Sequence, residues 1–352
     1  MQRRTTAYTL ALGVALMMVS SAAMAQYQLV NLTSNQVGWA FRVDPLLVNG
    51  WGLARSAGSA WWLSDAGSGW STLYDGGGKP VQQLKVLIPT AGGGPDSPTG
   101  ANGPGSPTGI VVNGSKAGEF QVQGWQADFL FATLDGTISG WAPQSNFNQA
   151  IIAVDNSAKK AVYTGLAITN KASGNFLYAA DLANNKVDVY DGGFNLVTSF
   201  TDSALPAGFA PFGIQDINGL VYVAFASTTG GTGGYVDVFT EAGVFVNTLI
   251  SGAPLNQPWG IAVAPPKFGP LSNALLISNN TNTGVINGFN SVTGKFVGTV
   301  KDSGGTPIHI DQLWGIAFGG GTASNGGTNQ LYFTAGPSGN LAGTFGVINF
   351  KP

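Results

Sequence analysis

Carboxylate and amide side chains recur at one place in successive segments of the chain, directly after a short apolar run. The four residues at this place are Asp65, Asp135, Asp181 and Asn279. Such oxygen ligands suit a hard cation such as Ca²⁺, which takes about six to eight oxygens and accepts amide and backbone carbonyl groups. Asp and Asn at strand ends also cap turns by accepting from nearby backbone N–H groups. Both interpretations are open, and the first predicts a cation held jointly by these residues.

Other polar residues precede a second type of apolar run and complete the set of candidate ligand-binding residues. They are Asp44, Asn49, Asn256, His309 and Asp311, together with Asp202 in a longer loop and Trp70 shortly after Asp65. His309 is the single His of the chain. With an ordinary pKa of about 6.5 it could transfer a proton beside Asp311, although a lone His is more often a loop residue whose hydrogen bonds are satisfied.

The composition excludes several kinds of active site. The chain has 352 residues, no Cys and one His, so thiolate zinc sites, cysteine nucleophiles, multi-histidine metal sites and conventional Ser/His hydrolases are not expected. Charged residues make up 9% of the chain, hydrophobic residues make up 44%, and 53 residues are Gly. These values indicate a folded protein with many turns.

One short phrase recurs six times and defines the repeat that must position these residues. Each copy has a bulky or polar residue, then Gly, then an aliphatic residue, as in Trp51-Gly52-Leu53 and Trp259-Gly260-Ile261. The six glycines are Gly52, Gly109, Gly165, Gly213, Gly260 and Gly315, at separations of 57, 56, 48, 47 and 55 residues. This length fits four short strands with their turns, so each repeat is predicted to form one blade of a β-propeller.

The two ends of the chain predict how the ring closes. Second, third and fourth β-rich runs follow the phrase in the repeats, but the sixth repeat ends without a fourth run. Residues 27–32 (YQLVNL) form an unassigned strand-like run near the N-terminus. We therefore predict an all-β fold, a six-bladed β-propeller of four-stranded blades closed by the N-terminal strand in the last blade. A pair of β-sandwich domains is the competing fold, but it would not explain why the phrase occupies the same position in each of the six repeats.

The predicted fold places the candidate residues on one face. Loops between second and third strands emerge on the same face as the connections between blades, and we call this the loop face. The candidates are expected there around one mouth of the channel, where propellers commonly bind ligands. Trp51, Trp259 and Trp314 share the repeat position and are expected to pack between neighbouring blades. The better candidates for exposed stacking on a ligand are Trp39, Trp70 and Trp125.

Four segments carry a resemblance to a known family. Residues 49–54 (NGWGLA), 132–141 (ATLDGTISGW), 205–214 (LPAGFAPFGI) and 331–337 (LYFTAGP) resemble a family of uncharacterised secreted bacterial six-bladed β-propeller proteins, and more distantly NHL-repeat propellers. The similarity covers nearly the whole mature chain. It implies the fold and secretion, and it implies no particular activity.

Two functions from different classes remain open. The first is a secreted binding or scaffold propeller that recognises a partner protein, a glycan or a small molecule through the loop face. The alternative is a metal-dependent hydrolase or lactonase, by analogy with gluconolactonase-like propellers, in which a divalent ion such as Ca²⁺ polarises a carbonyl. That kind of site uses a Glu near the start of an inner strand. Neither Glu119 nor Glu241 is expected there, which favours the binding function.

The N-terminus predicts export. Arg3 and Arg4 precede an apolar run, and Ala23-Met24-Ala25 supplies the small residues of a cleavage site, so residues 1–25 are predicted to be a secretory signal peptide. The run is too short to span a membrane. The mature chain, residues 26–352, is expected to be a single propeller domain without a membrane span, periplasmic or extracellular, and monomeric. It keeps 13 basic and 17 acidic residues, so nucleic acid is not an expected partner.

Overall fold

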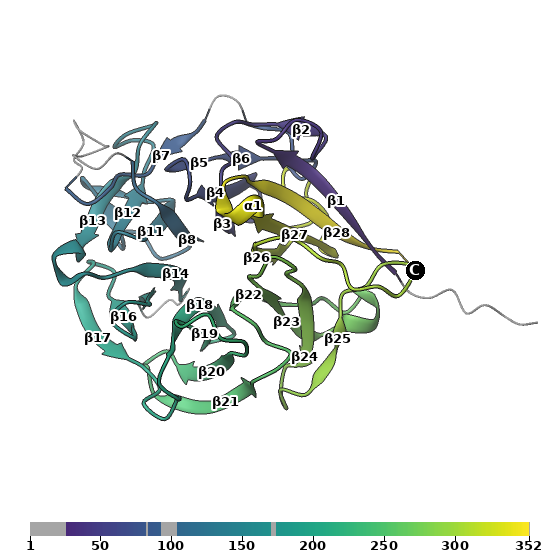
Figure 1. The fold of residues 1–352 in the computed structure, drawn as a ribbon. Coiled ribbons are helices and arrows are strands. Elements are labelled where there is room, and N and C mark those ends of the chain that lie inside the picture. Colours follow the sequence, from purple (N-terminus) through teal and green to yellow (C-terminus); the bar gives the residue numbers. More distant parts are fainter. Residues whose placement is uncertain (1–25, 82–83, 93–103, 170–173, 352) are drawn as a thin grey trace, which may run out of the picture.

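The protein is a ring of six β-sheets, as the computed structural model of residues 26–81, 84–92, 104–169 and 174–351 shows (Figure 1). The predicted six-bladed β-propeller is confirmed. Within these ranges the single α-helix is the four-residue α1 (Pro337–Asn340), and the 3-10 turns are η1 (Ser157–Lys159) and η2 (Gly269–Leu271). None of the helices in the described part of the chain is long and apolar enough to cross a membrane. The predicted signal peptide lies outside the described residues.

Each blade starts with an inner strand that carries the repeated phrase. The inner strands are β3 (Gly50–Ala54), β8 (Pro107–Val112), β14 (Tyr163–Ile168), β18 (Phe209–Ile217), β22 (Pro258–Val263) and β26 (Leu313–Phe318). The second strands are β4 (Trp61–Asp65), β11 (Phe129–Thr133), β15 (Leu177–Asp181), β19 (Leu220–Ser227), β23 (Ala274–Asn279) and β27 (Gln330–Ala335). Blades 1 to 6 are numbered below in this order.

The outer half of each blade is more variable. The third strands are β5 (Trp70–Ser71) with β6 (Leu73–Tyr74), β12 (Thr137–Trp141), β16 (Lys186–Tyr190), β20 (Tyr235–Thr240), β24 (Ile286–Asn290) and β28 (Thr344–Lys351). The fourth strands are β7 (Val86–Leu87), β13 (Ile151–Asp155), β17 (Leu196–Phe200), β21 (Phe245–Ser251) and β25 (Phe296–Thr299). In blade 1 the fourth strand has only two residues, fewer than in the other blades.

The N-terminal strand supplies the missing strand of blade 6. β1 (Gln26–Ser34) pairs antiparallel with β28, so that Leu29 lies opposite Ile348 and Val30 opposite Val347. The two strands run side by side in Figure 1. This pairing confirms the predicted closure. The sequence did not predict the parallel edge strand β2 (Arg42–Val43) or the hairpin of β9 (Gln121–Val122) and β10 (Trp125–Gln126) between β8 and β11.

The repeated glycines lie where neighbouring inner strands approach each other. A Cβ atom on Gly52 would lie 2.5 Å from the carbonyl oxygen of Thr108, and one on Gly260 would lie 2.7 Å from that of Trp314. A Cβ on Gly213 would overlap the carbonyl oxygen of Trp259. Glycine is therefore required because only a residue without a Cβ lets one inner strand pack on the backbone of the next.

Candidate functional site

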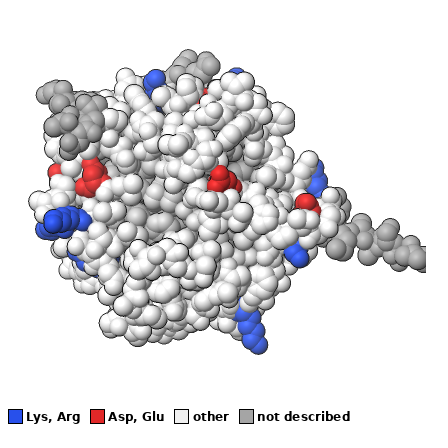
Figure 2. All heavy atoms as spheres, viewed as in Figure 1, with Lys and Arg blue, Asp and Glu red and all other residues white. Residues whose placement is uncertain are grey.

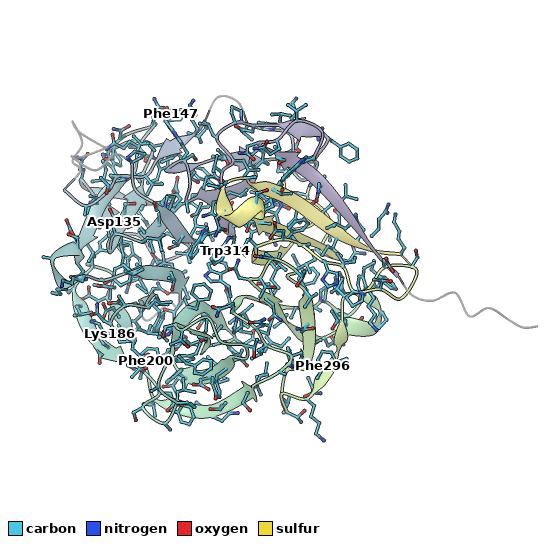
Figure 3. All side chains as sticks on the ribbon, in the orientation of Figure 1. Asp135, Phe147, Lys186, Phe200, Phe296 and Trp314 are labelled. Atoms are coloured by element: carbon cyan, nitrogen blue, oxygen red, sulfur yellow. The ribbon has the colours of Figure 1, made fainter. Side chains whose placement is uncertain are left out.

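An aromatic cluster fills the channel mouth on the loop face. Trp51, Phe212, Trp259 and Trp314 each stand just before a phrase glycine, and none is more than 9% exposed. The rings of Trp51 and Trp314 stack with centroids 3.5 Å apart, and Trp259 meets both edge-on at 6.1 and 5.9 Å. Trp314 lies at the centre of the ring in Figure 3. The tryptophans thus pack on each other around the channel axis, beyond the predicted packing between neighbouring blades.

The four candidate cation ligands each hold a loop of the propeller. Asp135 accepts from Thr90 Oγ1 at 2.6 Å and from the Ala91 backbone N–H at 2.5 Å. Asn279 accepts from the Asn256 backbone N–H at 3.1 Å. In both cases the bond holds a blade-to-blade connection against the end of a second strand. This is the structural role that the turn-making interpretation predicts.

Asp65 and Asp181 are fully buried within their own loop networks. Asp65 accepts from the Thr72 hydroxyl at 2.7 Å and its backbone N–H at 3.2 Å, and burial raises the pKa of Asp65 well above its ordinary value. Asp181 accepts from the Val162 backbone N–H at 3.1 Å and from Asn184 Nδ2 at 2.7 Å.

The structure does not gather the four candidates into one group. Asp135 lies toward the periphery of the ring in Figure 3, well away from the central Trp314. Among the described residues no three His, Cys, Asp or Glu side chains lie close enough together to hold a metal ion. Ca²⁺ binding remains a prediction from the sequence, and these contacts give it no support.

A change at Asp181 separates the turn-making role from the cation role. Asp181→Ala removes the acceptor of the Val162 and Asn184 N–H groups, so we expect a loss of about 2 to 3 kcal/mol of unfolding free energy. Urea denaturation with and without Ca²⁺ measures this loss, and we expect the same value in both. If Ca²⁺ instead stabilises the wild type and has no effect on Asp181→Ala, the residue is a cation ligand.

The remaining candidates lie in separate places. Asp44 accepts from the Tyr74 hydroxyl at 3.1 Å, and Asn49 Oδ1 accepts from Trp314 Nε1 at 3.1 Å. Asp202 caps its own loop through the Ala204 N–H at 2.8 Å. Asn49 therefore fixes Trp314 of the aromatic cluster through this bond, while the two aspartates stabilise other loops.

His309 lies between two hollows at the junction of blades 5 and 6. Its Nδ1 is 3.2 Å from the carbonyl oxygen of Thr283, and the side chain is exposed. One hollow, of about 140 Å³, places His309 beside Asp311 and Trp39. The other, of about 670 Å³, has His309, Asp302 and Lys351 in its wall. Three sequence candidates therefore share one surface, although no hydrogen bond joins His309 to Asp311 among the contacts of the described residues.

An exposed apolar loop borders this surface, and the sequence analysis missed most of it. Between β1 and β3, Val37 is 86% exposed, Trp39 44% and Phe41 77%. Leu341, in the loop between β27 and β28, is 78% exposed. The two loops are joined by backbone contacts of Gly343 with Asn35 and of Asn49 with Ala342. We call Val37, Trp39, Phe41 and Leu341 the apolar rim.

The other tryptophans predicted to be exposed differ from each other. Trp125 is 51% exposed, at the tip of the hairpin on the face opposite the loop face. Trp70 is half-buried, and Lys85 Nζ lies 5.0 Å from its ring centroid. Charged side chains are few and scattered in the view of Figure 2, so no charged patch competes with the apolar rim there.

Comparisons with known proteins support the fold and leave the activity open. No protein-family profile matches the chain. It is 36% identical over 202 residues to uncharacterised protein R640 of Acanthamoeba polyphaga mimivirus, which is 53% of this chain but 37% of that protein. It is 29% identical to uncharacterised protein R648 of the same virus, over 93% of this chain and 81% of that protein. These relatives are viral, whereas the resemblance seen in the sequence was to bacterial proteins.

Solved structures with the same fold have diverse functions. A gluconolactonase, XC5397 from Xanthomonas campestris, matches with a TM-score of 0.56 at 13% identity, over 93% of this chain and 90% of its own. A streptogramin B lyase matches with a TM-score of 0.55 at 14% identity, over 94% of this chain and 100% of its own. At such low identity the matches show a β-propeller and no shared chemistry.

Proposed function

We propose that the chain is an exported binding propeller that recognises an extracellular protein or glycan through the apolar rim and the adjoining hollow of His309. The observation that carries the proposal is the exposure of Val37, Trp39 and Phe41 in one loop. Large apolar side chains grouped at a surface usually mark a contact site, because their exposure to water is unfavourable. Trp39 and Phe41 offer flat faces for a sugar ring or an apolar side chain of a partner.

The hydrolase alternative has less support. It needs a metal ion that several carboxylates hold at the channel mouth, but the aromatic cluster occupies that mouth on the loop face. The carboxylates that the sequence places around this mouth, those of Asp65, Asp135 and Asp181, accept hydrogen bonds from loop backbone and from neighbouring hydroxyl or amide groups. His309 is exposed and Asp311 is half-buried, with its Oδ2 accepting from the Ser338 backbone N–H at 2.8 Å, and no group of metal-binding side chains lies beside them among the described residues.

Photo-crosslinking tests the binding function. A benzoylphenylalanine at position 41 is expected to capture a defined protein in the secretion medium of the host, or the isolated cell-envelope polysaccharide if the partner is a glycan. Adding Trp39→Ser is expected to lower the yield at least tenfold, because hot-spot aromatic side chains contribute most of such binding. The measurement is adduct yield by mass spectrometry.

A matched control uses the other face. Trp125 has a similar exposure to Trp39 but lies on the β9–β10 hairpin. Benzoylphenylalanine at position 125 is expected to give no defined adduct. Equal capture at both positions would mean nonspecific contact and would contradict the assignment of the apolar rim.

A further inference from the structure

The second mouth of the channel, opposite the loop face, is open. A pocket of about 300 Å³ lies there at the ends of the inner strands. Its walls include Leu53, Ile110, Val112 and Phe318, contributed by blades 1, 2 and 6. The narrow channel behind it is lined by Leu53, Ile110 and Gln215 as well, so the pocket is the widened end of the channel. Most of the side chains in its wall are apolar, and its volume is at the lower end of the range for small-molecule sites.

One cationic side chain enters this apolar wall. Arg55 follows directly after β3 and lines the pocket, and burial lowers its pKa. Its Nε and Nη2 donate to the carbonyl oxygen of Phe318 at 3.1 and 2.9 Å, and its Nη1 donates to that of Ser56 at 3.4 Å. The guanidinium carbon lies 5.4 Å from the ring centroid of Trp61. These contacts fix the position of the guanidinium group.

Within the described part of the chain, the charge of Arg55 has no anionic partner. No carboxylate of the described residues forms an ion pair with it, since the ion pairs among those residues are Lys116–Glu119 and Lys186–Asp188. A guanidinium has five N–H groups, and the three bonds above leave one N–H on each terminal nitrogen without an acceptor in the described structure. A partly buried cation without an anionic partner favours the binding of an anion beside it. Such a group in a pocket is typical of a binding site.

The opposite wall of the pocket determines which way a ligand would be oriented. Gln215 and Asp216 line the pocket from β18 of blade 4, which stands across the ring from blade 1. A ligand with its anionic group at Arg55 therefore keeps this group on the wall away from Asp216. The other side chains of the wall are mostly apolar, so they favour a ligand whose remainder is apolar as well.

We propose that this pocket binds a small molecule with an apolar body and one carboxylate, which pairs with Arg55. The two free N–H groups match the two oxygens of a carboxylate, and the aliphatic and aromatic walls cover a short hydrocarbon chain. The site is separate from the apolar rim, on the other face of the propeller. A positively charged ligand is disfavoured because Arg55 would repel it.

Isothermal titration calorimetry of the mature protein with octanoate tests the proposal. We expect binding with a dissociation constant on the order of 0.1 mM, and at least about tenfold weaker binding of octylammonium and of 1-octanol. Arg55→Met keeps the length of the side chain and is expected to weaken octanoate binding about tenfold or more. Arg42→Met is the control, since Arg42 also donates to a carbonyl, that of Gly77, but does not line the pocket.

A second variant covers the case in which Arg55→Met does not fold. Val112→Phe keeps the charge and reduces the apolar space, and it is expected to weaken octanoate binding about tenfold while leaving Arg55 in place. Unchanged octanoate binding in either folded variant would overturn the proposal. So would octylammonium binding as tightly as octanoate, or the absence of octanoate binding to the wild type.

Discussion

Replacing Asp237 by Asn is expected to stabilise the protein by about 3 to 4 kcal/mol at pH 8 and to change its stability little at pH 3. Asp237 lies on β20 and is fully buried, and neither of its carboxylate oxygens has a hydrogen-bond partner within ordinary geometry among the described residues. Burial, together with the nearby Asp202 carboxylate, raises the pKa of Asp237 to about 7, and a weak contact with the Thr248 hydroxyl opposes the increase only in part. Each pKa unit corresponds to about 1.4 kcal/mol.

The sign of the effect follows from proton binding. Between the ordinary pKa of an Asp, 3.8, and about 7, the folded protein holds a proton on Asp237 that the unfolded chain has released. Stability therefore falls as the pH rises through this window and is constant above it, as far as this group is concerned. Asn carries no charge, so the variant loses this dependence. Chemical denaturation of both proteins from pH 3 to 9 measures the difference, and parallel curves would contradict it.

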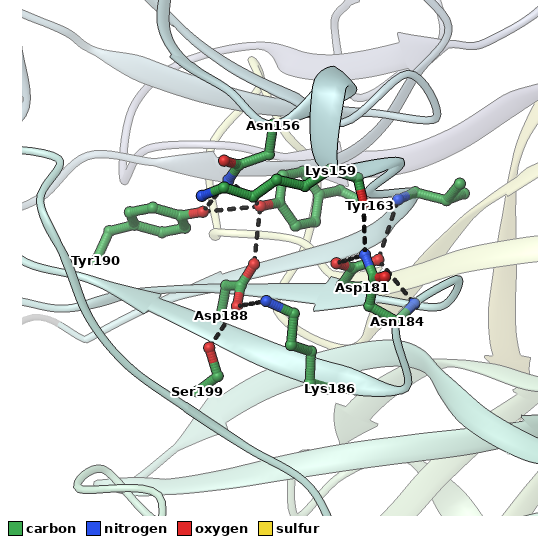
Figure 4. Close-up of polar contacts among 10 residues, drawn as sticks. Asn156, Lys159, Tyr163, Asp181, Asn184, Lys186, Asp188, Tyr190 and Ser199 are labelled. Carbon is green, nitrogen blue, oxygen red and sulfur yellow. Dashed lines mark hydrogen bonds and ion pairs between the residues drawn. The ribbon is translucent and has the colours of Figure 1, made fainter.

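Equivalent positions in neighbouring blades explain why Asp237 is exceptional. In blade 5 the position holds Asn287, whose Oδ1 accepts from Thr299 at 2.8 Å and whose Nδ2 donates to the Pro254 carbonyl at 3.1 Å. An amide is thus already compatible with the propeller there. In blade 3 the position holds Asp188, which pairs with Lys186 Nζ at 2.7 Å and accepts from Tyr163 at 2.9 Å (Figure 4).

Asp188→Asn is therefore the matched control, with the opposite expected sign. It would weaken the ion pair to Lys186 and the bonds from Tyr163 and Ser199, so we expect a loss of about 2 kcal/mol at pH 7. In blade 4 the residue equivalent to Lys186 is Tyr235, which supplies no positive charge. The two substitutions therefore have opposite expected signs because blade 3 has the positive charge of Lys186 beside the carboxylate and blade 4 does not.

The sequence predicted the blades because each repeat carries its own local signals. A phrase that recurs six times, strand-like runs and Gly-containing turns determine strand order, and the unpaired run at 27–32 determines the closure. The candidate site was less predictable. Asp at the end of a second strand has the same sequence pattern whether it binds an ion or the backbone N–H of Val162, and only the positions of the loops distinguish these roles.

Features at the axis were missed for a related reason. The contact of Trp51 with Trp259 joins blades that are not adjacent, so it depends on the radius of the ring and not on either repeat. Arg55 likewise looks like an ordinary loop residue in the sequence. Among the described residues no carboxylate lies within ion-pair distance of Arg55, and the sequence of one repeat does not show this because the walls of the pocket come from several blades.

The phrase glycine of blade 4 should tolerate substitution least. Gly213→Ala is expected to cost about 3 kcal/mol or more, or to prevent folding, because the added Cβ would overlap the backbone carbonyl of Trp259. Backbone cannot rotate away as a side chain can, so relief requires the two inner strands to separate. Separation would also disturb the aromatic cluster, since Phe212 and Trp259 flank the contact.

Substitutions at two other glycines test whether the loss of stability depends on the space available for the added Cβ. In Gly165→Ala the Cβ would lie 3.1 Å from the Phe212 carbonyl oxygen, so a small shift suffices and we expect a cost of about 1 kcal/mol. Gly58 has open space around its Cβ position, and Gly58→Ala is expected to be neutral or slightly stabilising because Ala restricts the unfolded chain. Thermal and urea unfolding should rank the variants in this order. Equal costs at all three positions would indicate a general effect of removing glycine, and the phrase would then need an explanation other than close packing around the axis.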